Sequence, residues 1–258
     1  MPSRTGRIFA GLAILLVFPS FLHAWTDSTR IRMVQDALKV SPPALNTILE
    51  RYQEDLQRGM LDPSRHEDEE VHFQHGDGDR GMGAAGVARK VEEVRKILEK
   101  QGSLQRFVYE MGTLAHLISD IGFPLNASDS DPREPLYREA YRQYVERSLD
   151  KIPFVFEPGG PAELQEGDLE GFVMIRARQA ARSYELIGPA FRDDGTAISQ
   201  DAVDERSIPF GIASVSYSQA TTDIVRLWRY VWISVNGDLS GTPHLDKAGS
   251  GSEGGGSP

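Results

Sequence analysis

The sequence predicts an all-α protein, organised as a single compact multi-helix domain. Apolar residues recur at spacings of three and four along most of the chain, which is typical of amphipathic helices, and no long alternating stretch indicates strands. With 258 residues, of which 40% are hydrophobic, the chain is long enough to bury one substantial core. Capping and helix-ending residues then divide it into successive helical segments.

The first predicted helix is capped by Asp27 or Ser28 and carries apolar residues from Ile31 to Leu38 on one face. The second opens at Ser41-Pro-Pro, because proline suits the first turn of a helix, and continues through Leu56. Residues 61–86 are polar and rich in glycine, so a long irregular loop is expected there.

Further helices are predicted over residues 88–100, 103–121, 134–149, 162–187 and 212–235. The helix over 103–121 is capped by Ser103 and ended by Gly122-Phe-Pro124, because proline cannot continue a helix. Gly167 and Gly171 weaken the prediction for the first part of 162–187.

Residues 1–24 have the pattern of a secretory signal peptide, with Arg4 and Arg7 before an apolar stretch and the small residue Ala24 at its end. The alternative is an uncleaved membrane anchor, although the stretch is short for a spanning helix and contains Pro19. Cleavage after Ala24 would leave an all-helical domain over residues 25–236, a flexible Gly/Ser-rich tail over residues 237–258 and no transmembrane span. We therefore expect an exported protein, periplasmic or secreted.

The charge of the chain restricts its partners. The formal net charge is −10, and removal of the first 24 residues, which hold two arginines and no acidic residue, makes it −12. Such a surface repels phosphate backbones, which argues against a broad nucleic-acid-binding face. A small phosphate-ester site around a metal ion is not excluded, because the ion would dominate the local field. The chain has no cysteine, so any metal must be held by His, Asp, Glu or backbone groups.

The candidate chemistry centres on His116 and Asp120, which are four residues apart in an otherwise apolar helical segment. This spacing places both side chains on one helical face. An unpaired buried carboxylate is costly, so the two residues either form a structural polar pair or bind a cation. Asp62 and His72, in the preceding irregular region, can add a carboxylate and an imidazole, and such a set suits Zn²⁺ before Mn²⁺ or Fe²⁺. For His66, His72 and His75 the alternative is a solvated acidic loop, given the neighbouring Glu67-Asp-Glu-Glu70.

Several short segments also share the pattern of a known superfamily. They are the start of the mature chain at Trp25, Gly59-Met-Leu-Asp62, His72-Phe73 and His116-Leu-Ile-Ser-Asp120-Ile-Gly-Phe-Pro124. Over residues 25–152 the chain resembles the zinc-dependent phospholipase C and single-strand nuclease superfamily. The resemblance implies that Asp62, His72, His116 and Asp120 bind one zinc, and that Trp25 binds a second ion through its own amino and carbonyl groups, with Asp120 reaching toward it. It also implies that Asp62 orients or deprotonates the attacking water.

The chain departs from the superfamily pattern where further ligands are expected. Arg30 and Asn126 stand where the resemblance implies histidines, and Arg138 and Arg142 stand where it implies a His and a Glu. A guanidinium cannot be deprotonated to bind a metal, so most ligands of two of the three zinc ions are lost. These arginines either grip a phosphate or a carboxylate, or belong to a surface helix with pairs such as Arg142 with Glu146.

Two functions follow from this pattern. The first is an exported metal-dependent phosphoric-diester hydrolase acting on a phosphodiester or phospholipid-like substrate. The second is a non-catalytic binding or scaffold protein that keeps the fold and one structural zinc, because a closed four-ligand site leaves no position for water. A helical envelope protein unrelated to the superfamily is a third possibility. The sequence does not indicate an oligomeric state.

Overall fold

The computed structural model describes residues 24–63, 68–192, 196 and 204–244. The predicted signal peptide apart from Ala24, His66, and residues 245–258 of the predicted tail lie outside the described residues. Within them the chain is helical and contains no strand, which confirms the all-α prediction. The α-helices are α1 (Asp27–Leu38), α2 (Pro43–Arg51), α3 (Gln53–Leu61), α5 (Gly83–Glu99), α6 (Leu104–Ile121), α7 (Glu134–Ser148), α8 (Ala162–Glu166), α9 (Leu169–Ile187) and α10 (Ile208–Ser234).

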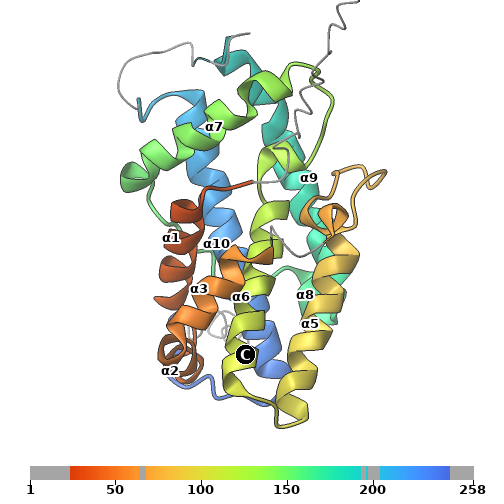
Figure 1. Ribbon diagram of the computed structural model, residues 1–258, viewed down its shortest axis with the longest axis vertical. Helices are drawn as coiled ribbons and strands as arrows, with labels where there is room; N and C mark the ends of the chain where they lie inside the picture. Colours follow the sequence, from red (N-terminus) through yellow and green to blue (C-terminus); the bar gives the residue numbers. More distant parts are fainter. Residues whose placement is uncertain (1–23, 64–67, 193–195, 197–203, 245–258) are drawn as a thin grey trace, which may run out of the picture.

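Helix α6 is the centre of the bundle (Figure 1). It packs against α3, α5, α9 and α10, while α1 packs against α10 and α3. Every residue of α6 from Met111 to Ile121 is buried, so the helix is apolar on all sides except where its polar residues find partners. Helix α7 crosses one end of the bundle in Figure 1. Two short 3₁₀ helices lie in the connections, η1 (Glu69–His72) between α3 and α5 and η2 (Pro124–Asn126) between α6 and α7.

Two glycines let α3 and α6 approach unusually closely. A Cβ atom added to Gly59 would lie 1.9 Å from the Tyr109 carbonyl oxygen, and one added to Gly112 would lie 2.2 Å from that of Leu56. Real Cβ atoms do not make such contacts, so only glycine fits at either position. This close crossing brings the C-terminal end of α3, with Met60, against the buried polar face of α6.

The helix boundaries differ from the predicted ones at several places. The first helix is capped by Thr26, which accepts a hydrogen bond from the Thr29 amide, rather than by Asp27 or Ser28. Helix α5 begins at Gly83 rather than at residue 88, within the predicted irregular loop.

The second predicted helix is two helices, because Tyr52 leaves the helical region with φ −118° and ψ 39°. Gly167 adopts φ 82°, a left-handed conformation that glycine accepts readily, and separates α8 from α9. Helix α10 begins at Ile208 rather than 212, because Ser207 accepts a hydrogen bond from the Phe210 amide and proline follows in the first turn.

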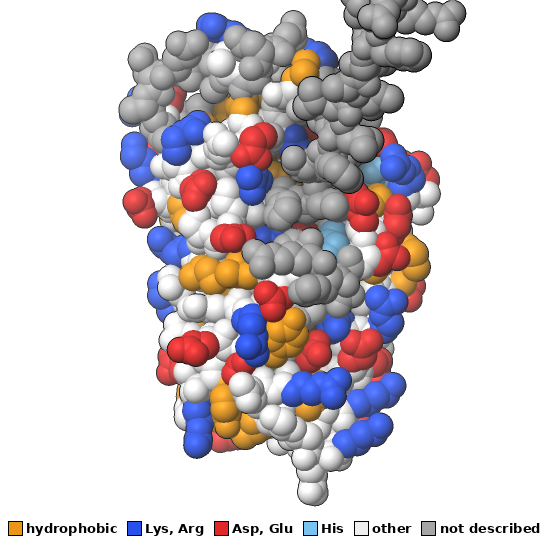
Figure 2. All heavy atoms as spheres, viewed as in Figure 1, with side chains coloured by type: hydrophobic (Ala, Val, Ile, Leu, Met, Phe, Trp, Pro, Cys, Tyr) orange, Lys and Arg blue, Asp and Glu red, His pale blue; other side chains and the backbone are white. Residues whose placement is uncertain are grey.

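The surface carries charges of both signs, and Figure 2 shows acidic and basic side chains interspersed over the face in view. None of the helices in the described residues is long and apolar enough to cross a membrane. Residues 237–244, within the predicted tail, make contacts with the domain. Thr242 is buried, and the His244 ring lies 5.6 Å from the ring of Phe156.

Candidate metal centre

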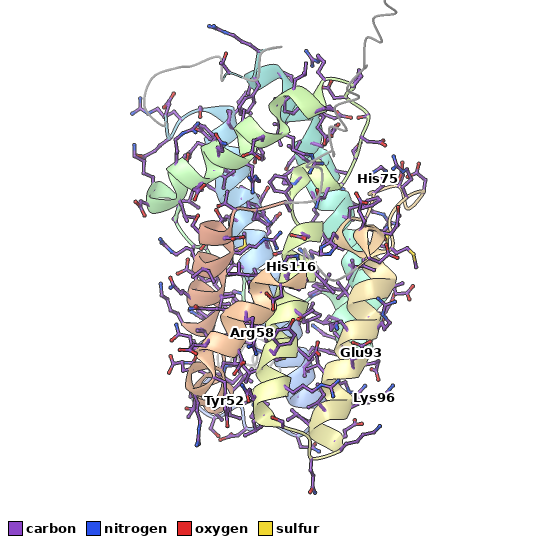
Figure 3. All side chains as sticks on the ribbon, viewed as in Figure 1. Tyr52, Arg58, His75, Glu93, Lys96 and His116 are labelled. Atoms are coloured by element: carbon purple, nitrogen blue, oxygen red, sulfur yellow. The ribbon has the colours of Figure 1, made fainter. Side chains whose placement is uncertain are left out.

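The polar centre of α6 is built as its sequence spacing predicts. His116 and Asp120 are both fully buried, and His116 Nε2 lies 3.0 Å from Asp120 Oδ2. They face the same side because four residues make slightly more than one helical turn. Figure 3 shows His116 in the middle of the bundle, well away from His75, which lies on the loop at the edge.

His72 reaches this pair from η1, as predicted. Its Nδ1 lies 2.9 Å from Asp120 Oδ2 and 3.2 Å from His116 Nε2. The side-chain amide of Asn126 holds the two segments together, since its Nδ2 donates to the backbone oxygens of His72 and Asp120, each at 3.1 Å. Asn126 therefore has a positioning contact where the resemblance implies a histidine ligand.

The three residues offer a donor set that fits one zinc ion. One ligand atom from each of His72, His116 and Asp120 lies within 4.8 Å of the other two. The separations of 2.9, 3.0 and 3.2 Å approach the value of roughly 3.3 Å expected between ligand atoms bound to one tetrahedral zinc at about 2.0–2.1 Å. Nitrogen and oxygen donors in this ratio also suit zinc.

Arg30 approaches the same centre from α1 and is itself buried, with 1% of its side chain exposed. Its Nη2 lies 2.7 Å from Asp120 Oδ1, its Nη1 lies 2.8 Å from His116 Nδ1, and its Nε donates to the Trp25 carbonyl oxygen at 3.3 Å. The guanidinium of Arg30 thus forms a buried ion pair with the carboxylate of Asp120. A divalent cation at the centre would bind against the repulsion of this fixed charge.

His116 Nδ1 has two competing partners. Arg30 Nη1, which can only donate, lies 2.8 Å away, and the Met60 carbonyl oxygen, which can only accept, lies 2.7 Å away. A neutral imidazole that accepts from Arg30 has its proton on Nε2 and donates it to Asp120. A neutral imidazole that donates from Nδ1 to Met60 has a free lone pair on Nε2. Histidines that bind a metal through Nε2 and donate from Nδ1 to a backbone carbonyl have this tautomer.

The electrostatics of the centre keep Asp120 ionised and His116 neutral. Burial alone would raise the pKa of Asp120, but the positive charge of Arg30 and the hydrogen bonds from both histidines hold this pKa far below its usual value. Burial, together with the nearby Arg30 charge, lowers the pKa of His116. A neutral imidazole is the form that can bind a metal.

The other two predicted site residues, Trp25 and Asp62, are not part of this group. Trp25 is buried, donates from Nε1 to the Ser119 carbonyl oxygen at 2.8 Å, and touches the centre through its own carbonyl, which accepts from Arg30. Asp62 caps the C-terminal end of α3 and lies outside the group of three ligand residues. Its carboxylate accepts a hydrogen bond of 3.5 Å from the Tyr109 hydroxyl.

A cavity of about 310 Å³ adjoins the centre at His72. Nε2 of His72 is buried and has no hydrogen-bond partner among the described residues. Arg138 lines the same cavity, where it pairs with Glu134 and donates from Nη1 to Asn126 Oδ1 at 2.9 Å. The cavity is also lined by acidic and basic side chains, Glu69, Arg80, Asp129 and Asp131, and by the rings of Phe73 and His75.

The remaining predicted residues have structural partners. Arg142 pairs with Glu139 rather than with Glu146, whose carboxylate instead accepts from the Ser28 hydroxyl. His75 is buried at the cavity edge, and its Nδ1 lies 3.3 Å from Asp79 Oδ1. The sequence predicts that Arg30 cannot bind a metal and can pair with a carboxylate or a phosphate. It does not predict that the carboxylate is that of Asp120.

Comparison with known structures agrees with this architecture. The alpha-toxin of Clostridium perfringens, from an avian strain, superposes with a TM-score of 0.55 at 14% sequence identity. The alpha toxin of Clostridium absonum superposes with a TM-score of 0.55 at 16% identity. This chain has the alpha-toxin fold. At these identities the match concerns the fold alone, and it agrees with the all-α fold that the sequence predicts.

In both comparisons the aligned region covers 82% of this chain and 63% of the toxin chain, so this chain spans less than two thirds of either toxin. No protein-family model and no curated protein matches the sequence. The alpha-toxin fold therefore supports the arrangement of the helices, and the chemistry of the centre depends on the residues described above.

Proposed function

We propose that this chain is an exported hydrolase of phosphoric diesters, of the phospholipase C type, with one zinc held by His72, His116 and Asp120. The observation that carries the proposal is the convergence of three ligand atoms at 2.9–3.2 Å in the fold of the alpha-toxins, beside a cavity that shares His72. The predicted signal peptide, which lies almost wholly outside the described residues, supports export.

The number of ligands favours a catalytic centre over a structural one. Structural zinc sites have four protein ligands, whereas catalytic sites have three and keep one position open. Because Asp62 lies outside the ligand group, the centre has three. When bound, zinc supplies Lewis acidity and activates water near neutral pH.

The residues around the cavity have separate tasks in this proposal. With Nδ1 directed at the centre, His72 holds a proton on Nε2 and offers it to a substrate oxygen in the cavity. Arg138 places a fixed positive charge on the cavity wall for a phosphate oxygen. Asp62 does not line the cavity; it is partly exposed, accepts a hydrogen bond from Tyr109, and is proposed from the superfamily pattern as the residue that accepts a proton from water.

The mixed charge of the cavity wall favours a substrate that carries both a phosphate and a cationic group. Two arginines line the wall, together with the carboxylates of Glu69, Asp129, Asp131 and Glu134. A long anionic polymer would meet more carboxylates than arginines there. A phospholipid-like headgroup with an amine satisfies both kinds of side chain.

The decisive experiment combines metal analysis with a hydrolysis assay on the purified mature protein. We expect about one zinc per chain and zinc-dependent hydrolysis of a chromogenic phosphodiester. His72→Ala should lose both the zinc and the activity, whereas Asp62→Asn should keep the zinc and lose the activity. Arg89→Gln, an exposed change on α5, is the control. Full activity of Asp62→Asn, or of the protein after zinc removal, would contradict the proposal.

A second candidate is a non-catalytic binding or scaffold protein, and the buried pair of Arg30 and Asp120 favours it. The guanidinium already neutralises the only carboxylate of the centre, at 2.7 Å. His116 and Asp120 are fully buried, and only His72 of the three lines the cavity. A protein that purifies without zinc, remains folded in a chelator and hydrolyses no phosphodiester would support this candidate.

A further inference from the structure

A cluster of arginines lies between α9 and α10, apart from the centre described above. Arg176 of α9 and Arg226 of α10 both contact Asp223, which is 3% exposed. Arg226 Nη1 donates to Asp223 Oδ1 at 2.9 Å, and Arg176 Nε lies 3.5 Å from Asp223 Oδ2. Arg229 follows Arg226 by three residues on α10, which places it on the same face of the helix.

The positive charge of this cluster exceeds the negative charge available to it. Arg176 and Arg226 contact the one buried carboxylate, that of Asp223, while Arg229 lies close enough to Arg226 to feel its charge. The other carboxylate within ion-pair distance in the described residues is that of Glu157, 3.7 Å from Arg226 and 60% exposed. Burial lowers the pKa of Arg229, and the charge of Arg226 adds to this effect. The cluster therefore holds excess positive charge in a poorly solvated place.

Several N–H groups of the cluster are buried without an acceptor. Among the described residues no hydrogen-bond partner is found for Nε of Arg226, whose side chain is 9% exposed, and Nε of Arg176 has only the ion-pair contact with Asp223 at 3.5 Å. Nε and Nη2 of Arg229 likewise have no hydrogen-bond partner within the described part of the chain. These two atoms of Arg229 form one edge of the guanidinium, the edge that binds a carboxylate or phosphate through two parallel hydrogen bonds.

The segment that precedes α8 is held against α10 next to this cluster. Arg226 Nη2 donates to the backbone oxygen of Glu157 at 3.2 Å and also to that of Gly159, so residues 157–159 are fastened to α10. The Phe156 ring lies 6.0 Å from the Arg229 guanidinium, and His244 packs against the same ring at 5.6 Å. An anion here would meet a fixed, partly desolvated set of donors, in which charge-assisted hydrogen bonds are strong.

We propose that Arg229, with Arg226 and Arg176 behind it, binds a small oxyanion of the phosphate class between α10 and the segment 157–159. The anion supplies the two acceptors that the Arg229 edge lacks and reduces the repulsion among the three guanidinium groups. This site is separate from the His72 cavity, because none of its residues lines that cavity. It is expected to bind whether or not the centre on α6 holds a metal.

The test is a phosphate titration of the full-length mature protein, followed by thermal unfolding at constant ionic strength in chloride. The wild type is expected to show a saturable rise in Tm with inorganic phosphate, and glycerol phosphate in a parallel titration shows whether a phosphate monoester binds as well. Arg229→Gln should raise the half-saturating concentration at least about tenfold, because it removes a charged two-bond contact. Arg229→Lys, which keeps the charge without the planar edge, should fall between the two.

Arg89→Gln makes the same change of charge on α5, far from the cluster in sequence, and is expected to leave the titration unchanged. Two results would overturn the proposal. One is a wild type with no saturable response, which means that water serves the buried donors. The other is an Arg229→Gln response equal to that of the wild type, which means that phosphate binds elsewhere.

Discussion

Replacing Arg30 by methionine removes the guanidinium from the buried centre while keeping most of the apolar stem. Arg30 and Asp120 are 1% and 0% exposed, and their closest atoms are 2.7 Å apart. Removing one partner of such a pair leaves an uncompensated buried charge and typically costs about 3–5 kcal/mol. We therefore expect Arg30→Met to lower the free energy of unfolding by about that amount in the presence of a chelator.

Zinc should reverse part of this loss if the centre binds a cation. Two unit charges about 4 Å apart interact by about 4 kcal/mol at an effective dielectric constant near 20, so removal of Arg30 should strengthen zinc binding at least about tenfold. Zinc at 100 times its Kd adds about 2.7 kcal/mol to the free energy of unfolding. The assay is urea unfolding of wild type and variant, each with chelator and with zinc, together with zinc titration by calorimetry.

The double variant Arg30→Met with Asp120→Asn is the matched control, because it removes both charges. Its loss of stability should be smaller than that of Arg30→Met alone, since no unpaired carboxylate remains. The reasoning is refuted if Arg30→Met costs less than about 1 kcal/mol in chelator. It is also refuted if the variant binds zinc no more tightly than the wild type.

Two further predictions concern the bundle itself. Gly112→Ala places a Cβ 2.2 Å from a backbone oxygen of α3 and should lower the free energy of unfolding by at least about 1–3 kcal/mol. Gly211→Ala, whose new Cβ would have no atom within 4 Å, should raise the free energy of unfolding by up to about 1 kcal/mol. Urea unfolding of both variants checks this prediction, and equal effects of the two changes would contradict it. Burial alone would raise the pKa of Asp36, but hydrogen bonds from Lys39 and Tyr217 lower it below 3.8. This carboxylate thus stabilises the fold above about pH 4, and the contribution is lost as the pH falls through the folded-state pKa. Unfolding measured from pH 6 to pH 2 should show a steeper fall for wild type than for Asp36→Asn, and parallel curves would contradict the assignment.

The sequence predicted the parts of the site that follow from local geometry. A spacing of four residues fixes His116 and Asp120 on one face of α6, whatever the rest of the chain does. The approach of His72 from the irregular region was inferred from its residue type and from the superfamily pattern, and the structure brings its Nδ1 to 2.9 Å from Asp120. Both inferences rest on the cost of leaving a buried carboxylate without a partner.

The rest depended on contacts between distant segments, which spacing does not reveal. Asp62 follows the last turn of α3, so the crossing of α3 and α6 sets its direction, and its carboxylate meets Tyr109. The break between α2 and α3 at Tyr52 involves no glycine or proline, so the sequence does not indicate it. The sequence does carry the start of α10, because Ser207 followed by proline two residues later is a helix-start signal, although the helix predicted from the apolar pattern begins only at residue 212.

Arginine at position 30 changes what the centre requires. A histidine ligand is neutral, so a carboxylate buried with it needs a metal ion to balance its charge. Arg30 brings that positive charge on the chain itself, which explains how Asp120 stays ionised at 0% exposure. The fold of the centre can then persist without metal, whereas zinc binding must overcome the guanidinium. The two partners of His116 Nδ1, Arg30 at 2.8 Å and the Met60 carbonyl at 2.7 Å, correspond to these two states, because one nitrogen can satisfy only one of them at a time. Zinc binding therefore requires the state in which Nδ1 donates to Met60, because only then does Nε2 have a free lone pair.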